Sequence, residues 1–211
     1  LPDDTVNAFV TDPPYYDAIA YGDLSDFFYV WLRRALKDIH PRLFGNHLGD
    51  KTDEIVHLSK RFRGPYPHKT KEYFEGGMTQ ALAEARRYLN PYGIGVVVFA
   101  HKSTSGWESM LQALLDGGWT VTGSWPIDTE MSTRMNAMGT AALESSIHLV
   151  CRQRENGDGV VMDNIGDWRD VLQELPTRIH AWLPRLANEG VVGADALFAC
   201  LGPALEVFSR Y

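Results

Sequence analysis

Val6-Asn7-Ala8-Phe9-Val10-Thr11-Asp12-Pro13-Pro14-Tyr15 is the stretch from which the fold can be worked out. Residues 6–11 are a short apolar run, and the two prolines that follow cannot continue a ladder of backbone hydrogen bonds. A strand is therefore expected to end at Asp12, where the chain turns. In α/β sheets, ligands bind just outside the carboxyl ends of strands. The sequence thus predicts a polar site directly after this strand.

The rest of the chain alternates helical and strand patterns. Apolar residues at helical spacing predict helices at 24–37, 70–89 and 105–116, and β-branched or aromatic runs predict further strands at 94–100, 119–125 and 146–151. This alternation is typical of an α/β fold with helices on both faces of the sheet, and the run 94–100 is typical of a strand buried on both faces. Because no helix separates the last two strands, we expect them to pair antiparallel in a mixed sheet.

The length of 211 residues suits one domain with a small appendage. A linker is expected at 155–159, where the chain reads Glu-Asn-Gly-Asp-Gly. We expect residues 1–155 to be the C-terminal part of a larger domain, because the chain begins without Met and enters a strand within a few residues. Residues 156–211 are expected to form a helical C-terminal appendage, with helices at 167–187 and 194–208.

Composition narrows the class of protein. Hydrophobic residues make up 45% and charged residues 22% of the chain, as in ordinary globular proteins. No apolar run reaches the roughly 18 residues of a membrane span, so we expect no membrane segment. The two cysteines, Cys151 and Cys200, lie far apart, which fits a reducing, cytoplasmic setting. No histidine pairs with cysteine at zinc spacing, so no metal site is expected.

The distribution of charge is more informative than the net value of −7. Residues 33–72 contain ten of the 20 Lys and Arg residues but only five of the 27 Asp and Glu residues. A basic segment on an acidic body can follow the phosphates of a nucleic acid. A solvated loop with surplus basic residues explains the same charge pattern equally well.

The residues after the first strand have a definite chemistry. Asp12 can accept a hydrogen bond from an amino group, and Pro13 can present its carbonyl from a rigid turn. Two such acceptors would draw an aryl amine towards tetrahedral geometry, so that its lone pair faces an electrophilic methyl group. Tyr15 offers a flat face on which a base flipped out of a duplex can stack. Alignment and electrostatics would then supply most of the catalysis.

The motif and its surroundings resemble a known family. Asp-Pro-Pro-Tyr after an apolar strand is the hallmark of amino methyltransferases that modify adenine, and less often cytosine, in DNA. The longer strings at 10–17, 21–32, 97–102 and 124–127 resemble large adenine-specific DNA methylases that carry a domain of unknown function, the DUF1156 type. The resemblance covers about residues 1–155. It implies a Rossmann-like sheet, S-adenosylmethionine as cofactor and DNA as partner.

Site residues follow from this chemistry and this resemblance. The expected catalytic residues are Asp12, Pro13, Pro14 and Tyr15. The expected cofactor contacts are Thr11, Asp12 and Pro14, and the expected substrate contacts are Tyr16, Asp17, His101 and Lys102. Each has a plainer interpretation: Asp12 as a turn residue, Tyr16 as a core aromatic, and His101 and Lys102 as polar residues of a strand-to-helix loop. The aromatic residues of helix 24–37 are expected to pack in the core.

The chain departs from the family in one respect. In the family a glycine-rich loop for the cofactor precedes the Asp-Pro-Pro-Tyr strand, whereas here Gly93-Ile94-Gly95 lies before its strand and so at the wrong end of it. We therefore expect this chain to carry the target-amine half of the site and to need an upstream segment for the cofactor half. Two alternatives remain open: an amino methyltransferase acting on RNA or protein, and a non-catalytic segment.

Overall fold

The structure is a computed structural model that describes residues 1–17, 19–61, 63–101, 103–128, 145–154, 167–191 and 193–208. Its elements alternate as expected from the sequence. In chain order they are β1 (Val6–Thr11), α1 (Tyr21–Leu36), α2 (Pro41–Phe44), α3 (Lys71–Tyr88), β2 (Leu89–Phe99), α4 (Thr104–Asp116), β3 (Trp119–Asp128), β4 (Ser145–Gln153), α5 (Trp168–Asn188) and α6 (Gly193–Phe208). None of the helices among the described residues is both long and apolar enough to cross a membrane.

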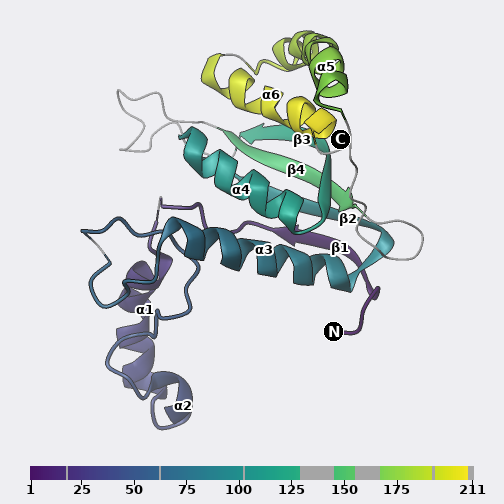
Figure 1. Ribbon diagram of the computed structural model, residues 1–211. Coiled ribbons are helices and arrows are strands. Elements are labelled where there is room, and N and C mark those ends of the chain that lie inside the picture. Colours follow the sequence, from purple (N-terminus) through teal and green to yellow (C-terminus); the bar gives the residue numbers. More distant parts are fainter. Residues whose placement is uncertain are drawn as a thin grey trace. The chain divides into compact units, whose positions relative to one another are not determined.

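The four described strands form one mixed sheet in the order β1-β2-β4-β3. β1 and β2 run parallel, and β4 lies between β2 and β3 and is antiparallel to both (Figure 1). The expected mixed α/β sheet with an antiparallel last strand is therefore confirmed.

The chain divides into two compact units. The first, the sheet unit, comprises Leu1–Pro13 and Met78–Tyr211, and the second, the α1 unit, comprises Pro14–Gly77. The core of the sheet unit lies against α3 and α4. Trp119 is buried there, its indole N–H donates to the Leu82 carbonyl at 2.9 Å, and its ring centroid lies 6.1 Å from that of Phe9. One aromatic side chain thus joins α3 to β1 and β3.

β2 begins earlier than expected, at Leu89 rather than at Ile94. Asn90-Pro91 stops helix α3, but the chain enters the strand at once. The Asn90 side-chain amide donates to the Val6 carbonyl at 3.1 Å, and the register shifts so that Val6 pairs with Leu89 and Ala8 with Ile94. Because a side chain supplies the donor that Pro91 lacks, the irregular segment stays in the ladder.

The expectation that β2 is buried on both faces is wrong for the described structure. Val97 and Phe99 are buried, whereas Val96 and Val98 on the other face are only half-buried. A continuous β-branched run thus gives a sheet with one well-covered face.

The C-terminal segment is helical, as the sequence predicts, and its helices belong to the sheet unit. α6 lies directly against β3, where the Ser124 hydroxyl donates to the Ala199 carbonyl at 3.4 Å and Gly202 faces Ser124. α5 packs on α6, and Arg178 on α5 forms an ion pair with Glu206 on α6 at 2.5 Å. The boundary predicted at residue 155 lies outside the described residues and stays a prediction.

In the α1 unit, helix α1 differs from its prediction in two ways. It begins at Tyr21 rather than near residue 24, and the backbone N–H of Gly22 in its first turn donates to the Glu54 carboxylate at 2.7 Å instead of to Asp23 or Ser25. None of its residues, all of which the structure describes, is buried. The expectation that its aromatic residues form core is therefore wrong for this unit.

Candidate functional site at the carboxyl ends of β1 and β2

Asp12 and Pro13 directly follow β1 at the carboxyl end of the parallel pair. Thr11, the last residue of β1, is in register with Val97 of β2. Asp12 is exposed, whereas Pro13 is buried. The carboxylate therefore faces solvent, while the proline that follows it is held in the sheet unit. This is the position at which doubly wound sheets bind ligands.

His101 follows the carboxyl end of β2, the neighbouring parallel strand. The Ser103 backbone N–H donates to His101 Nδ1 at 3.1 Å, and the Ser103 hydroxyl lies 2.9 Å from the same atom. A backbone N–H can only donate, so Nδ1 accepts in this contact with Ser103. The sheet unit thus brings His101 and Asp12 to the same edge of the sheet, as expected from their places in the sequence.

The contacts around His101 show that it also has a structural role. Its side chain is 5% exposed, its carbonyl accepts from the Trp107 indole at 2.8 Å, and its ring packs against Gly106. Ser103, which caps α4, also holds this ring. His101 therefore anchors the start of α4, and its predicted contact with substrate stays a prediction. Lys102, the other substrate residue predicted here, lies outside the described residues.

The tetrapeptide crosses from the sheet unit into the α1 unit between Pro13 and Pro14. Pro14 and Tyr15 are half-buried, and Asp17 is exposed. Tyr16 has a φ of 54°, in the left-handed region that non-glycine residues rarely occupy, and its N–H donates to the Pro14 carbonyl at 3.1 Å. The chain therefore makes a sharp turn immediately after Tyr15.

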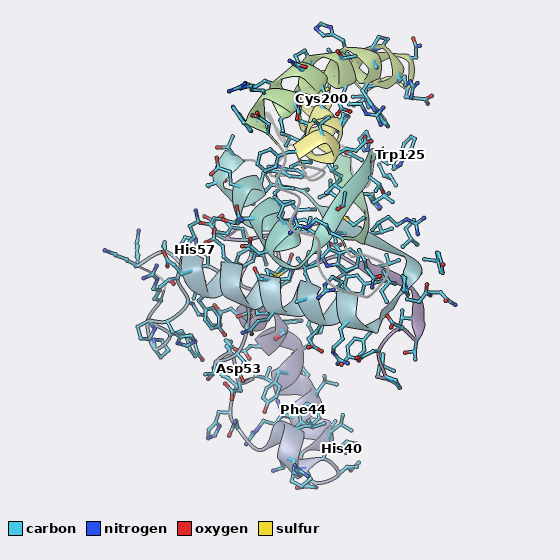
Figure 2. The ribbon with its side chains drawn as sticks, turned by 45° about the vertical axis from the view of Figure 1, so that its right-hand side comes forward. His40, Phe44, Asp53, His57, Trp125 and Cys200 are labelled. Atoms are coloured by element: carbon cyan, nitrogen blue, oxygen red, sulfur yellow. The ribbon has the colours of Figure 1, made fainter. Side chains whose placement is uncertain are left out.

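Packing within the α1 unit holds Tyr16 in this conformation. Its ring centroid lies 4.8 Å from that of His57 and 5.3 Å from that of Phe74, and its carbonyl accepts from the His57 N–H at 3.2 Å. Burial raises the pKa of the Tyr16 phenol. These contacts favour the interpretation of Tyr16 as a core aromatic. His57, labelled in Figure 2, is the residue against which the turn is fixed.

Two buried lysines organise the α1 unit, and sequence reasoning missed both. Lys69 forms an ion pair with Glu54 at 3.0 Å, and the other oxygen of this carboxylate accepts from Gly22 N–H. Lys51 forms an ion pair with Asp26 at 2.6 Å. The Lys51–Asp26 pair and the Gly22–Glu54 hydrogen bond tie the loop after α2 to the first turns of α1, and the Lys69–Glu54 pair joins two points of that loop. The partners lie 15 to 32 residues apart in sequence, so no local pattern announces them.

These ion pairs change the meaning of the basic segment at 33–72. Lys51 and Lys69 neutralise carboxylates inside the α1 unit and do not contribute to its surface. The exposed Lys and Arg residues of the segment are Arg34, Lys37, Arg42, Lys60 and Arg61. Four acidic residues of the same segment, Asp38, Asp50, Asp53 and Glu72, are exposed too, so the excess of basic residues at its surface is much smaller than the composition indicates.

The glycine pair at the start of β2 packs tightly and does not form a cofactor loop. A Cβ atom at Gly93 would come within 2.5 Å of Leu89, and one at Gly95 within 2.5 Å of Trp119. Both glycines lie inside the strand. Their close packing admits the side chains of Leu89 and Trp119, so this described glycine pair does not form a cofactor loop.

Comparison with known proteins adds no relative. No protein-family model matches the chain, and no curated protein matches it. Among the described residues, no three His, Cys, Asp or Glu side chains gather in a way that would hold a metal ion.

Proposed function

We propose that the chain carries the target-amine half of an S-adenosylmethionine-dependent methyltransferase that acts on the exocyclic amino group of adenine in DNA. One observation carries the proposal: Asp12-Pro13-Pro14-Tyr15 directly follows a parallel strand, with the Asp12 carboxylate exposed at the ligand-binding edge of the sheet. The mixed sheet with an antiparallel last strand supports it, because a Rossmann-like methyltransferase sheet of this kind is what the family resemblance implies.

Asp12 and Pro13 bind the amine in this proposal. One N–H of the amino group donates to the Asp12 carboxylate and the other to the Pro13 carbonyl. These bonds pull the nitrogen lone pair out of conjugation with the ring. S-adenosylmethionine, when bound, would supply a methyl group from its sulfonium sulfur: the new N–C bond would form as the S–C bond breaks, a neutral thioether would leave, and the surplus proton on the nitrogen would pass to solvent. The chain contributes orientation and negative charge, and no covalent enzyme intermediate is required.

Tyr15 stacks on the base. Its position one residue before the turn at Tyr16 supports this assignment, since the turn is fixed by packing inside the α1 unit. A half-buried ring next to a fixed turn loses little freedom when a base stacks on it. The exposed basic residues of the α1 unit approach the phosphates.

We assign the cofactor half of the site to a segment that precedes these residues in a longer polypeptide. Thr11, Asp12 and Pro14 can border a cofactor, but the described glycine pair Gly93 and Gly95 packs inside β2. We therefore predict that the 211-residue chain binds S-adenosylmethionine weakly or undetectably in isothermal titration calorimetry. Micromolar affinity for the isolated chain would refute this division of the site.

The substrate is tested separately by methyl transfer with the upstream polypeptide added. DNA, RNA and protein substrates are each incubated with labelled S-adenosylmethionine, and the modified nucleoside or residue is identified by mass spectrometry. N6-methyladenine in DNA supports the proposal. Methylation of RNA or protein alone would select the related amino methyltransferases, and no transfer to any substrate would favour a non-catalytic segment.

A further inference from the structure

Helix α1 carries an apolar stripe that its own unit leaves uncovered. Leu24, Phe27, Phe28 and Trp31 are 63%, 66%, 65% and 59% exposed. Their spacing of three and four residues places them on one side of the helix, over two turns. Exposed Ala35 continues the same line. A contiguous exposed stripe of this kind marks an interaction surface, unlike single exposed apolar residues. We call these five residues the α1 seam.

Charges of opposite sign flank the α1 seam at its two ends. Asp23 is in the first turn and Arg34 in the last turn of α1. At 100° per residue, both fall on the same side of the seam, next to Phe27. The Asp23 side chain is 71% exposed, and the Arg34 guanidinium lies 5.6 Å from the centre of the Trp31 ring. This flank of the helix is therefore acidic at its start and basic at its end.

The acidic start and the basic end of this flank match each other when two copies of α1 lie antiparallel. In an antiparallel helix pair, the same flank of each helix faces the other, so residues at the start of one lie opposite residues at the end of its partner. Two α1 helices centred on Phe27 and Phe28 place Leu24 of each copy opposite Trp31 of the other. Asp23 then lies opposite Leu32, about 3 Å along the helix axis from Arg34 of the other copy and within reach of its long side chain, and the two helix dipoles oppose each other favourably.

From this complementarity we propose that two copies of the chain associate through the α1 seam, antiparallel and related by a two-fold axis. Such an interface is isologous, since each copy contributes the same residues. Nucleic acid fits the seam less well, because its five residues include no cation and the exposed carboxylate of Asp23 lies beside its first half. Single-strand binding surfaces instead interleave aromatic and basic residues along their length. The inference does not depend on the proposed methyl transfer.

Sedimentation equilibrium of the 211-residue chain tests the association. We expect a concentration-dependent species of twice the 23.7 kDa mass of one chain. Phe28→Glu should yield a single chain, because a carboxylate at the centre of the seam would be buried twice in the dimer. Tyr92→Glu is the matched control: Tyr92 is 92% exposed and lies in the sheet unit, so this variant should still dimerise.

Charge reversal tests the antiparallel arrangement. Asp23→Arg and Arg34→Asp should each weaken dimerisation by about tenfold, because each places like charges face to face. The double variant should restore it to near the wild-type value. Asp23 also lies 4.0 Å from Lys51, so circular dichroism of each variant must first match that of the wild type. Single variants without effect, or a double variant as weak as the singles, would overturn the antiparallel pairing.

Two further results would overturn the proposal as a whole. The first is a single-chain mass at every concentration up to about 1 mM, the weak limit of specific association. The second is binding of a single-stranded oligonucleotide that Phe28→Glu abolishes and Tyr92→Glu does not, which would assign the seam to nucleic acid. A dimer that Phe28→Glu leaves intact would place the interface elsewhere and equally contradict it.

Discussion

At the scale of single residues, Glu54 links three parts of the α1 unit. It caps the first turn of α1 through Gly22, neutralises buried Lys69 and so holds the segment that leads into α3. The Lys69 side chain is 1% exposed, which removes it from water almost entirely. A buried cation that loses the carboxylate paired with it is costly, because its desolvation is no longer offset.

Replacing Glu54 with Gln tests this link. Gln can still accept from Gly22 but leaves Lys69 without its counter-charge, so Glu54→Gln should lower the free energy of unfolding by about 3 kcal/mol. Glu84→Gln is the matched control, because Glu84 pairs with Arg87 on the surface at 2.8 Å, and it should cost less than about 1 kcal/mol. Urea unfolding measures both, and equal effects would contradict the buried link.

The ion pair between Asp26 and Lys51 predicts that stability depends on pH. The hydrogen bond between the two side chains lowers the pKa of Asp26 below its ordinary value of 3.8 and raises the pKa of Lys51 above its ordinary value of 10.5. Because the pKa of Asp26 is lowered in the folded state, its ionised carboxylate stabilises the fold above pH 3.8. This stabilisation is lost as the pH falls through the folded-state pKa. Because the pKa of Lys51 is raised in the folded state, its charged ammonium group stabilises the fold below pH 10.5. This stabilisation is lost as the pH rises through the folded-state pKa.

The stabilisation from the pair is therefore complete between these two limits. The difference in unfolding free energy between the wild type and Asp26→Asn should be constant from just above 3.8 to just below 10.5. It should shrink as pH moves outside that window, because one partner loses its charge in the wild type as well. A difference that persists undiminished well below 3.8 would show that packing, and not charge, accounts for the role of Asp26.

At the scale of elements, the sequence predicts which helices and strands exist better than where they begin. The four strands and the helices longer than one turn lie where periodicity placed them. The start of α1 was missed because its capping carboxylate comes from Glu54, 32 residues away from Gly22. The start of β2 was missed because the Asn90 side chain bridges a position where proline lacks a donor. Local patterns cannot show contacts of this range.

Helix α6 offers a test of element packing. A Cβ at Gly202 would overlap the Ser124 side chain and come within 3.0 Å of its Cα, so Gly202→Ala should push α6 from β3 and cost about 2–3 kcal/mol. Gly76→Ala is the control within another helix, α3, where nothing lies within 4 Å of the added atom. That change should stabilise the protein by roughly 0.5–1 kcal/mol. Thermal unfolding measures both, and a neutral Gly202→Ala would contradict the close contact.

At the scale of the whole molecule, the α/β class and the mixed sheet could be predicted, but the use of each surface could not. Helical spacing shows that α1 has an apolar side; it does not show what covers that side, and the structure leaves it exposed. The same holds for the basic segment, part of which neutralises buried carboxylates. Asp12 and Pro13 could be placed from sequence because two prolines end a strand locally. The contacts around Tyr16 could not, since they depend on His57 and Phe74.

The central claim is that Asp12 binds the amine that becomes methylated. Methyl transfer to DNA by the chain together with its upstream segment, followed as N6-methyladenine by mass spectrometry, tests it most directly. Asp12→Ala should abolish the product while leaving the fold and the dimer unchanged, since Asp12 is exposed. Asp116→Ala, an exposed carboxylate at the end of α4, should keep full activity. N6-methyladenine formed equally well by Asp12→Ala would contradict the assignment.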